Sequence, residues 1–220
     1  MKYRSAFDII GPVMIGPSSS HTAGAARIGR VARTLFGKLP KKAIISLYGS
    51  FAKTYKGHGT DFAIVAGLLD LDTFDERMPK SLEIAKEKGL EIIFQIEEAL
   101  TDHPNTVKIN LYDGEHELEM VGISIGGGTI EITELNSFPL KLSGEHPAIL
   151  VVHQDRFGII SAVTSVLSKY KINIGHMEVS RLEKGEMALM VIEVDQKIEE
   201  IVIYELKNLS NVSQIIRMIE

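Results

Sequence analysis

A break in composition at residues 143–147 is the feature that most restricts how this chain can fold. These residues read SGEHP, a polar stretch with glycine and proline between two apolar segments, which is typical of a linker. After the break, the segments alternate as strand, helix, strand, strand, helix, strand. They span 148–153, 158–170, 172–182, 186–194, 197–209 and 213–219. We therefore expect two domains, 1–142 and 148–220, joined by the linker 143–147.

The order of the segments after the linker predicts a ferredoxin-like βαββαβ domain. The segment 148–220 is long enough for one small independent fold.

The first domain mixes helical and strand patterns, which indicates the α+β class. A helix is expected after the serines at 18–20, where apolar residues recur at spacings of three and four. They are Ile28, Val31, Ala32, Leu35 and Phe36. A second helix is expected with Thr60 or Asp61 as its N-cap, and a third from Pro79 to Gly89. Strands are expected within 41–50, at 90–98, in a hairpin over 105–128 that turns at Asp113-Gly114, and at 129–135.

Composition excludes several classes of function. The net charge is −5, there is no Trp, and no basic cluster contains interleaved aromatics, so nucleic acid is not an expected partner. The apolar runs are too short for a membrane span, and the N-terminus lacks the apolar stretch of a signal peptide. We expect no membrane partner and a cytoplasmic location. Without cysteine, this chain offers no thiolate for a cluster, and without an H-x-x-x-H spacing we expect no metal site in it.

The stretch IGPSSSHTAGAARIG has more polar groups than the start of a helix requires. A helix N-terminus presents unpaired N–H groups and the positive end of the dipole, so it attracts a carboxylate or phosphate. Ser18, Ser19, Ser20 and Thr22 add hydroxyl donors, and His21 can exchange a proton near neutral pH. We interpret the cluster as a site for a small carboxylate beside a proton-transfer group. The alternative is one capping serine and an incidental histidine.

Two glycine-rich segments are candidates for the rest of such a site. KGHGTD, at 56–61, places a histidine between glycines in a turn before a helix, where the imidazole and N–H groups can reach a ligand. SIGGG, at 124–128, follows a strand and can curve its N–H groups around an anion. A surface-loop histidine and a strand-to-strand bulge are the alternative interpretations. The candidate residues are His58, Gly59, Thr60, Ser124, Gly126 and Gly127.

Together, GPSSSHTAG, GHGTD, SIGGG and the C-terminal unit resemble the β subunit of the bacterial iron–sulfur-dependent L-serine dehydratases (L-serine ammonia-lyases) over essentially the whole chain. The resemblance implies conversion of L-serine to pyruvate and ammonia. It also implies a partner α chain whose cysteines hold a [4Fe–4S] cluster, which agrees with the absence of cysteine here. The first domain is then expected to be similar to the substrate-binding-like domain of some phosphoglycerate dehydrogenases.

The C-terminal unit resembles an ACT domain, a small amino-acid-sensing module. Its signature is HQDRFG, at 153–158, followed by Asn173 after the helix. In serine-sensing ACT domains a similar stretch binds L-serine, so the resemblance implies that His153, Asp155 and Asn173 bind an effector. Asp155 stands where those domains usually carry Asn. A carboxylate there would attract the ammonium group of a ligand and repel its carboxylate. Self-association through this domain is also expected.

The resemblance assigns roles to the two histidine motifs. Ser18 to Thr22 suit binding of the substrate carboxylate, and His21 or His58 suits removal of the α-proton as a neutral base. We rank His58 ahead, because its glycine neighbours allow it to project into a cleft between subunits. The site would be shared with the α chain, so this chain alone should be inactive.

Two other classes of function are kept as alternatives. A non-catalytic amino-acid-sensing regulatory subunit explains the ACT-like half but leaves SSSHT and GHGTD without a role. A stand-alone hydrolase with a Ser-His pair would require a nucleophile elbow such as G-x-S-x-G, and the sequence has none.

Overall fold

The computed structural model describes residues 12–218, which form two compact units. The first unit ends at Asn136 and the second begins at Ser137. The predicted linker 143–147 therefore lies inside the second unit. The expectation about the N-terminal segment lies outside the described residues. So do residues 1–11 of the first predicted domain and residues 219–220 of the second, with the end of its last predicted strand.

The first unit is a mixed sheet with helices. Its elements are η1 (Ser19–Gly24), α2 (Ala25–Phe36), β1 (Lys42–Leu47), α3 (Gly49–Thr54), α4 (Thr60–Leu68), η2 (Met78–Lys80), α5 (Ser81–Glu87), β2 (Glu91–Ile96), β3 (Thr106–Tyr112), β4 (Glu117–Gly126) and β5 (Thr129–Leu135). Together with β6 (Phe138–Leu142), these strands form a six-stranded sheet in the order β2-β1-β3-β4-β5-β6. β1 and β2 are parallel because a helical crossover joins them, and the other neighbours up to β5 are antiparallel.

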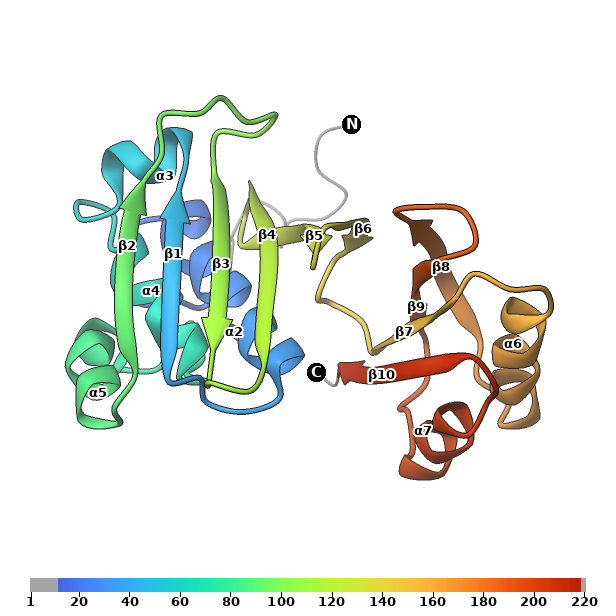
Figure 1. The fold of residues 1–220 in the computed structure, drawn as a ribbon. Coiled ribbons are helices and arrows are strands. Elements are labelled where there is room, and N and C mark those ends of the chain that lie inside the picture. Colours follow the sequence, from blue (N-terminus) through green and yellow to red (C-terminus); the bar gives the residue numbers. More distant parts are fainter. Residues whose placement is uncertain (1–11, 219–220) are drawn as a thin grey trace, which may run out of the picture. The chain divides into compact units, whose positions relative to one another are not determined.

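The helices of the first unit cover one face of this sheet (Figure 1). On that face β1 buries Ala43, Ile45 and Leu47 completely. α2 and α4 pack backbone against backbone: a Cβ at Gly67 would lie 2.0 Å from the Ala26 carbonyl oxygen, and one at Gly29 would lie 2.2 Å from that of Ile64. The absence of a side chain at both positions is what allows the two helices to approach so closely.

The second unit has the predicted strand–helix–strand–strand–helix–strand order, preceded by one additional strand. Its elements are β6 (Phe138–Leu142), β7 (Ala148–Gln154), α6 (Ile159–Lys169), β8 (Ile174–Arg181), β9 (Met187–Val194), α7 (Glu200–Lys207) and β10 (Val212–Met218). Four of the strands form an antiparallel sheet in the order β10-β7-β9-β8. Val163 of α6 and Val202 of α7 join one apolar core with Val151 and Met190 of the sheet. The α+β class and the ferredoxin-like second domain are confirmed.

Three local features differ from the expectations. The short helix α3 and the strand β6 were not predicted. The N-cap of α4 is Gly59 rather than Thr60 or Asp61, so that prediction is wrong. Gly59 adopts a left-handed conformation with φ of 69°, which a threonine or an aspartate rarely adopts.

No helix within residues 12–218 combines the length and the apolar character that crossing a bilayer requires.

Candidate functional site

The two histidine motifs lie in contact. The ring centroids of His21 and His58 are 4.9 Å apart and the ring planes meet at 66°. His21 lies in η1, the wide turn that runs into α2, and His58 lies in the turn before α4. The Thr22 hydroxyl donates to the His58 carbonyl oxygen over 2.8 Å, which fixes one segment to the other. The fold thus brings together two groups that the sequence could only name separately.

Hydroxyl groups flank both ring nitrogens of His21. Ser20 Oγ lies 3.0 Å from Nδ1, and Ser50 Oγ lies 3.0 Å from Nε2. Ser18 Oγ accepts the His21 backbone N–H over 3.1 Å and lies 3.3 Å from Ser20 Oγ. The rings of His21 and Phe51 also meet edge to face, with centroids 5.3 Å apart. Contacts at both ring nitrogens and with Phe51 therefore fix the orientation of the partly buried imidazole.

The electrostatics of the pair keep His21 neutral. Burial lowers the pKa of the His21 imidazole below its ordinary value of 6.5, and the charge of nearby His58 lowers it further. His58 itself is exposed. This arrangement suits a base that takes a proton from a molecule outside the fold.

The predicted hydroxyl donors fall into two groups. Ser18, Ser19 and Ser20 are partly exposed, so a ligand can reach this turn. Thr22 and Ser124 are fully buried, and their hydroxyls donate to the carbonyl oxygens of His58 and Ser20 respectively. Those two residues shape the turn. That any of the five binds substrate stays a prediction.

The start of α4 carries an unpaired polar group. The Thr60 hydroxyl is fully buried and has no hydrogen-bond partner within residues 12–218. Asp61 accepts the Phe62 N–H over 2.8 Å, and burial raises the pKa of the Asp61 carboxyl. Buried hydroxyls are almost always hydrogen-bonded, so the Thr60 hydroxyl at a helix N-terminus suits a ligand oxygen.

The glycines of SIGGG form a bulged strand-to-strand turn. The β4–β5 register shifts between Ser124 and Gly126, and Gly126, Gly127 and Gly128 all have positive φ. Arg27 donates to the Gly128 carbonyl oxygen over 2.9 Å, which ties the turn to α2. Substrate binding by Gly126 and Gly127 stays a prediction.

Sequence reasoning missed Ser50 and Phe51. Both belong to α3, which the sequence did not predict. The sequence carries one signal for Ser50: this serine follows a glycine shortly after the buried strand β1. Such strand ends often carry the polar groups of a site.

The described residues offer no metal centre of their own. Within 12–218 no three histidine, aspartate or glutamate side chains are grouped so that they could bind an ion, and the whole sequence lacks cysteine.

The three predicted effector residues of the second unit make no hydrogen bond to one another within residues 12–218. His153 is 1% exposed, its Nδ1 lies 2.8 Å from the Gln154 carbonyl oxygen, and its Nε2 has no partner within residues 12–218. Asp155 accepts hydrogen bonds from Arg181 (2.8 Å) and from the Gly185 N–H (2.9 Å), which lower the pKa of its carboxyl.

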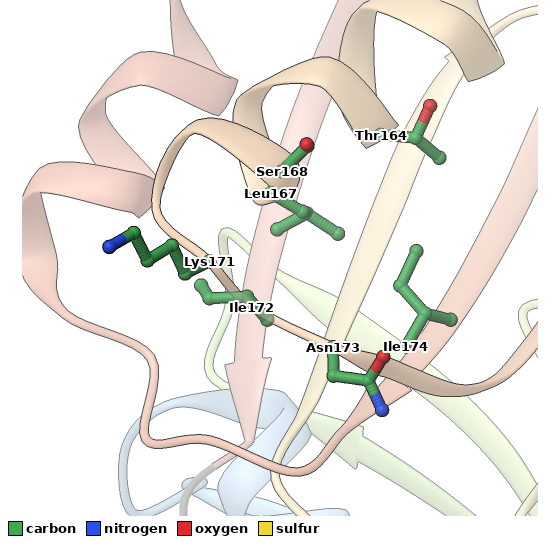
Figure 2. Close-up of a pocket in the computed structure, with 7 residues that line it drawn as sticks. All are labelled: Thr164, Leu167, Ser168, Lys171, Ile172, Asn173 and Ile174. Carbon is green, nitrogen blue, oxygen red and sulfur yellow. The ribbon is translucent and has the colours of Figure 1, made fainter.

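Asn173 borders a surface pocket of about 440 Å³ at the end of α6 (Figure 2). Its side-chain amide donates to Asp195 over 2.6 Å. The pocket is lined by Thr164, Leu167, Ser168, Lys171, Ile172, Asn173 and Ile174, a set that includes neither His153 nor Asp155.

Comparison with known proteins places this geometry in a family. Residues 5–85 match a family model described as "Serine dehydratase beta chain", and residues 148–211 match one described as "ACT domain". The chain is 64% identical over 218 residues to a "Probable L-serine dehydratase, beta chain" of Bacillus subtilis, covering 99% of each. The chain belongs to the L-serine dehydratase beta-chain family.

Two further L-serine dehydratases are similar to this chain. The "L-serine dehydratase, beta chain" of Peptoniphilus asaccharolyticus is 38% identical over 198 residues, or 89% of each chain. "L-serine dehydratase TdcG" of Escherichia coli is 34% identical over 151 residues, which are 57% of this chain and 33% of the Escherichia coli protein. The region matched to the beta-chain family contains both histidine motifs, and the ACT region contains all three predicted effector residues.

Proposed function

We propose that this chain is the β chain of a two-subunit L-serine ammonia-lyase that converts L-serine to pyruvate and ammonia. The observation that carries the proposal is the contact between His21 and His58 beside a serine-rich turn, in a member of the beta-chain family. The name "beta chain" supports a second subunit. TdcG supports it too, because this chain matches only 33% of that protein and the rest would correspond to another chain.

The serine-rich turn is proposed to hold the substrate carboxylate. Ser18, Ser19 and Ser20 supply partly exposed hydroxyls at the start of a long helical segment, η1 followed by α2. The unpaired Thr60 hydroxyl marks a second helix start beside the histidines. The positive ends of both helices favour a bound anion.

His58 is proposed to remove the α-proton of L-serine. Its ring is exposed and therefore accessible to a substrate, whereas both nitrogens of His21 are flanked by hydroxyls. Loss of this proton and of the β-hydroxyl leaves an enamine, whose hydrolysis gives pyruvate and ammonia. The adjacent His21 ring is neutral. It therefore meets the His58 ring edge to face without placing a positive charge beside it.

The [4Fe–4S] cluster that the family resemblance implies does not fit this chain. Without cysteine, and with no grouped histidine and carboxylate ligands within residues 12–218, the chain has no ligand set for such a cluster. We assign the cluster to the α chain and derive from this chain only carboxylate binding and proton transfer.

The proposal is tested by mixing purified His58→Ala and His21→Ala chains with reconstituted α chain under anaerobic conditions. We expect His58→Ala to lower kcat by roughly 10²–10⁴-fold, the usual contribution of a general base, and His21→Ala to lower it less. The exposed His116, in the β3–β4 turn, provides a matched control, and His116→Ala should leave turnover unchanged. Near-normal turnover by both His58→Ala and His21→Ala would reject the catalytic proposal.

The second unit is proposed to sense L-serine through His153, Asp155 and Asn173. The buried, unpaired Nε2 of His153 supports this, because a ligand atom would satisfy it. The ion pair of Asp155 with Arg181 offsets the charge that would repel a ligand carboxylate. Calorimetry of the full chain should detect binding of L-serine that His153→Ala abolishes, and absence of heat with the wild-type chain at millimolar L-serine would reject sensing.

A further inference from the structure

We propose that Ser50 is a positioning residue: by accepting a hydrogen bond from the Nε2–H of His21, it fixes the tautomer of that ring and its orientation beside His58. The inference rests on the proposed function of the two histidines. The inference goes beyond that function because it names a residue, outside both histidine motifs, that sets the geometry of the two rings.

The backbone holds Ser50 rigidly. Gly49 adopts a φ of +52°, and a Cβ there would lie 2.6 Å from the Pro104 carbonyl oxygen. The Ser50 N–H donates to that same oxygen over 2.7 Å, and the Thr54 hydroxyl donates to the Ser50 carbonyl oxygen over 2.9 Å. The Ser50 hydroxyl is therefore presented to His21 from a fixed point in the first turn of α3.

The hydrogen-bond chain favours one tautomer of His21. Ser18 Oγ accepts the His21 backbone N–H, so its own proton is free to be donated to Ser20 Oγ. In the proposed arrangement Ser20 donates to Nδ1, which is then the unprotonated ring nitrogen. The ring proton is on Nε2 and is donated to Ser50 Oγ.

Loss of the Ser50 hydroxyl would release one end of the ring. Nε2 would then lack its partner, while Ser20 could accept from a proton on Nδ1 equally well, since a hydroxyl both donates and accepts. The ring would become a mixture of tautomers and could rotate against Phe51 and His58. A base supported by a mobile neighbour is positioned less well for proton transfer.

The tautomer can be measured on the full chain without the α subunit. In ¹⁵N-histidine-labelled protein, the nitrogen shifts of His21, assigned by their loss in His21→Gln, report which nitrogen carries the proton. We expect the proton on Nε2 in the wild type, a mixture in Ser50→Ala, and recovery of the wild-type state in Ser50→Thr. Ser46→Ala is the matched control, because it removes a hydroxyl of β1 that is bonded to Gln95 instead.

Activity of the reconstituted enzyme provides the second readout. Ser50→Ala is expected to lower kcat about tenfold with little change in KM, while Ser46→Ala is unchanged. A wild-type proton on Nδ1, or a tautomer unaltered by Ser50→Ala, would overturn the proposal. An altered tautomer with unchanged kcat would also overturn the positioning role. The tautomer measurement does not depend on the activity of His58→Ala. Failure of the proposed function is therefore seen separately, as near-normal turnover of His58→Ala.

Discussion

The His21 imidazole makes stability depend on pH with a definite sign. Its pKa in the folded chain lies below the ordinary value of 6.5 because the ring is partly buried and next to His58. Well above pH 6.5, neither the folded nor the unfolded form binds a proton there. As the pH falls below 6.5, the unfolded ring is protonated first, so unfolding becomes more favourable. The free energy of unfolding should therefore fall as the pH falls through the folded pKa.

This dependence is measured by urea denaturation at several pH values from above 6.5 to about two units below it. We expect His21→Gln to show a smaller loss of unfolding free energy over that range than the wild type. An equal loss in His21→Gln and in the wild type would contradict the assignment of a lowered pKa to His21.

At the residue scale, the sequence predicts the types of group at the site but not all of its members. His21, His58 and the serines are recognisable because each stands in a local motif. Ser50 has no such motif, since its importance comes from a ring that approaches from another segment. The same limit applies to Thr22 and Ser124, whose hydroxyls turn inward to carbonyl oxygens that only the folded chain places near them.

At the scale of elements, the longer amphipathic segments were predictable and the short ones were not. α2 and α6 carry apolar residues at helical spacing and β3 and β4 alternate, so their pattern identifies them. α4 is buried on nearly every side, and its continuous apolar run identifies it. α3 has six residues, too few for a helix to be stable without tertiary contacts. Its stability comes from packing, notably the fully buried Phe51, which sequence periodicity cannot show.

The close contact between α2 and α4 predicts an effect opposite to helix propensity. Alanine normally stabilises a helix interior relative to glycine. At Gly67, however, the added Cβ would lie 2.0 Å from the Ala26 carbonyl oxygen and 2.5 Å from the Arg30 amide nitrogen. Since backbone atoms cannot move aside cheaply, we expect Gly67→Ala to destabilise the chain by about 1–3 kcal/mol, measured by urea denaturation.

A matched control for this prediction is available in the turn before α4. A Cβ at Gly57 would meet only the Thr54 carbonyl oxygen at 3.7 Å, which is ordinary contact. Gly57→Ala should therefore leave stability near that of the wild type. If Gly67→Ala were as stable as Gly57→Ala, the two helices would have to be further apart than the structure places them.

At the scale of the whole molecule, the predicted linker has a structural role within the second unit. The Ser143 N–H and hydroxyl both donate to Glu193 of β9. Leu140 and Leu142 of β6 are almost completely buried. Composition identified this stretch as a connector because it is polar and contains glycine and proline. It could not show that a short strand, β6, directly precedes it.

The exposed edge of the second sheet makes self-association through the ACT unit a testable expectation. β8 is an edge strand among the described residues, and its Met177 and Val179 side chains lie on the same face, 36% and 39% exposed. Unpaired edges with apolar side chains favour pairing with another chain. We therefore expect a dimer of this chain in which β8 lies at the contact, detectable by sedimentation at a series of concentrations.

A charge on this edge should weaken the dimer. Placing a lysine at Val179 requires burial of an unpaired charge at the contact, so Val179→Lys should raise the dissociation constant at least about tenfold, equivalent to about 1.4 kcal/mol. Ile201, 45% exposed on α7, is a comparable apolar residue outside β8, and Ile201→Lys should sediment like the wild type. If only Ile201→Lys dissociated the dimer, the contact would involve α7, and the assignment to the β8 edge would be wrong.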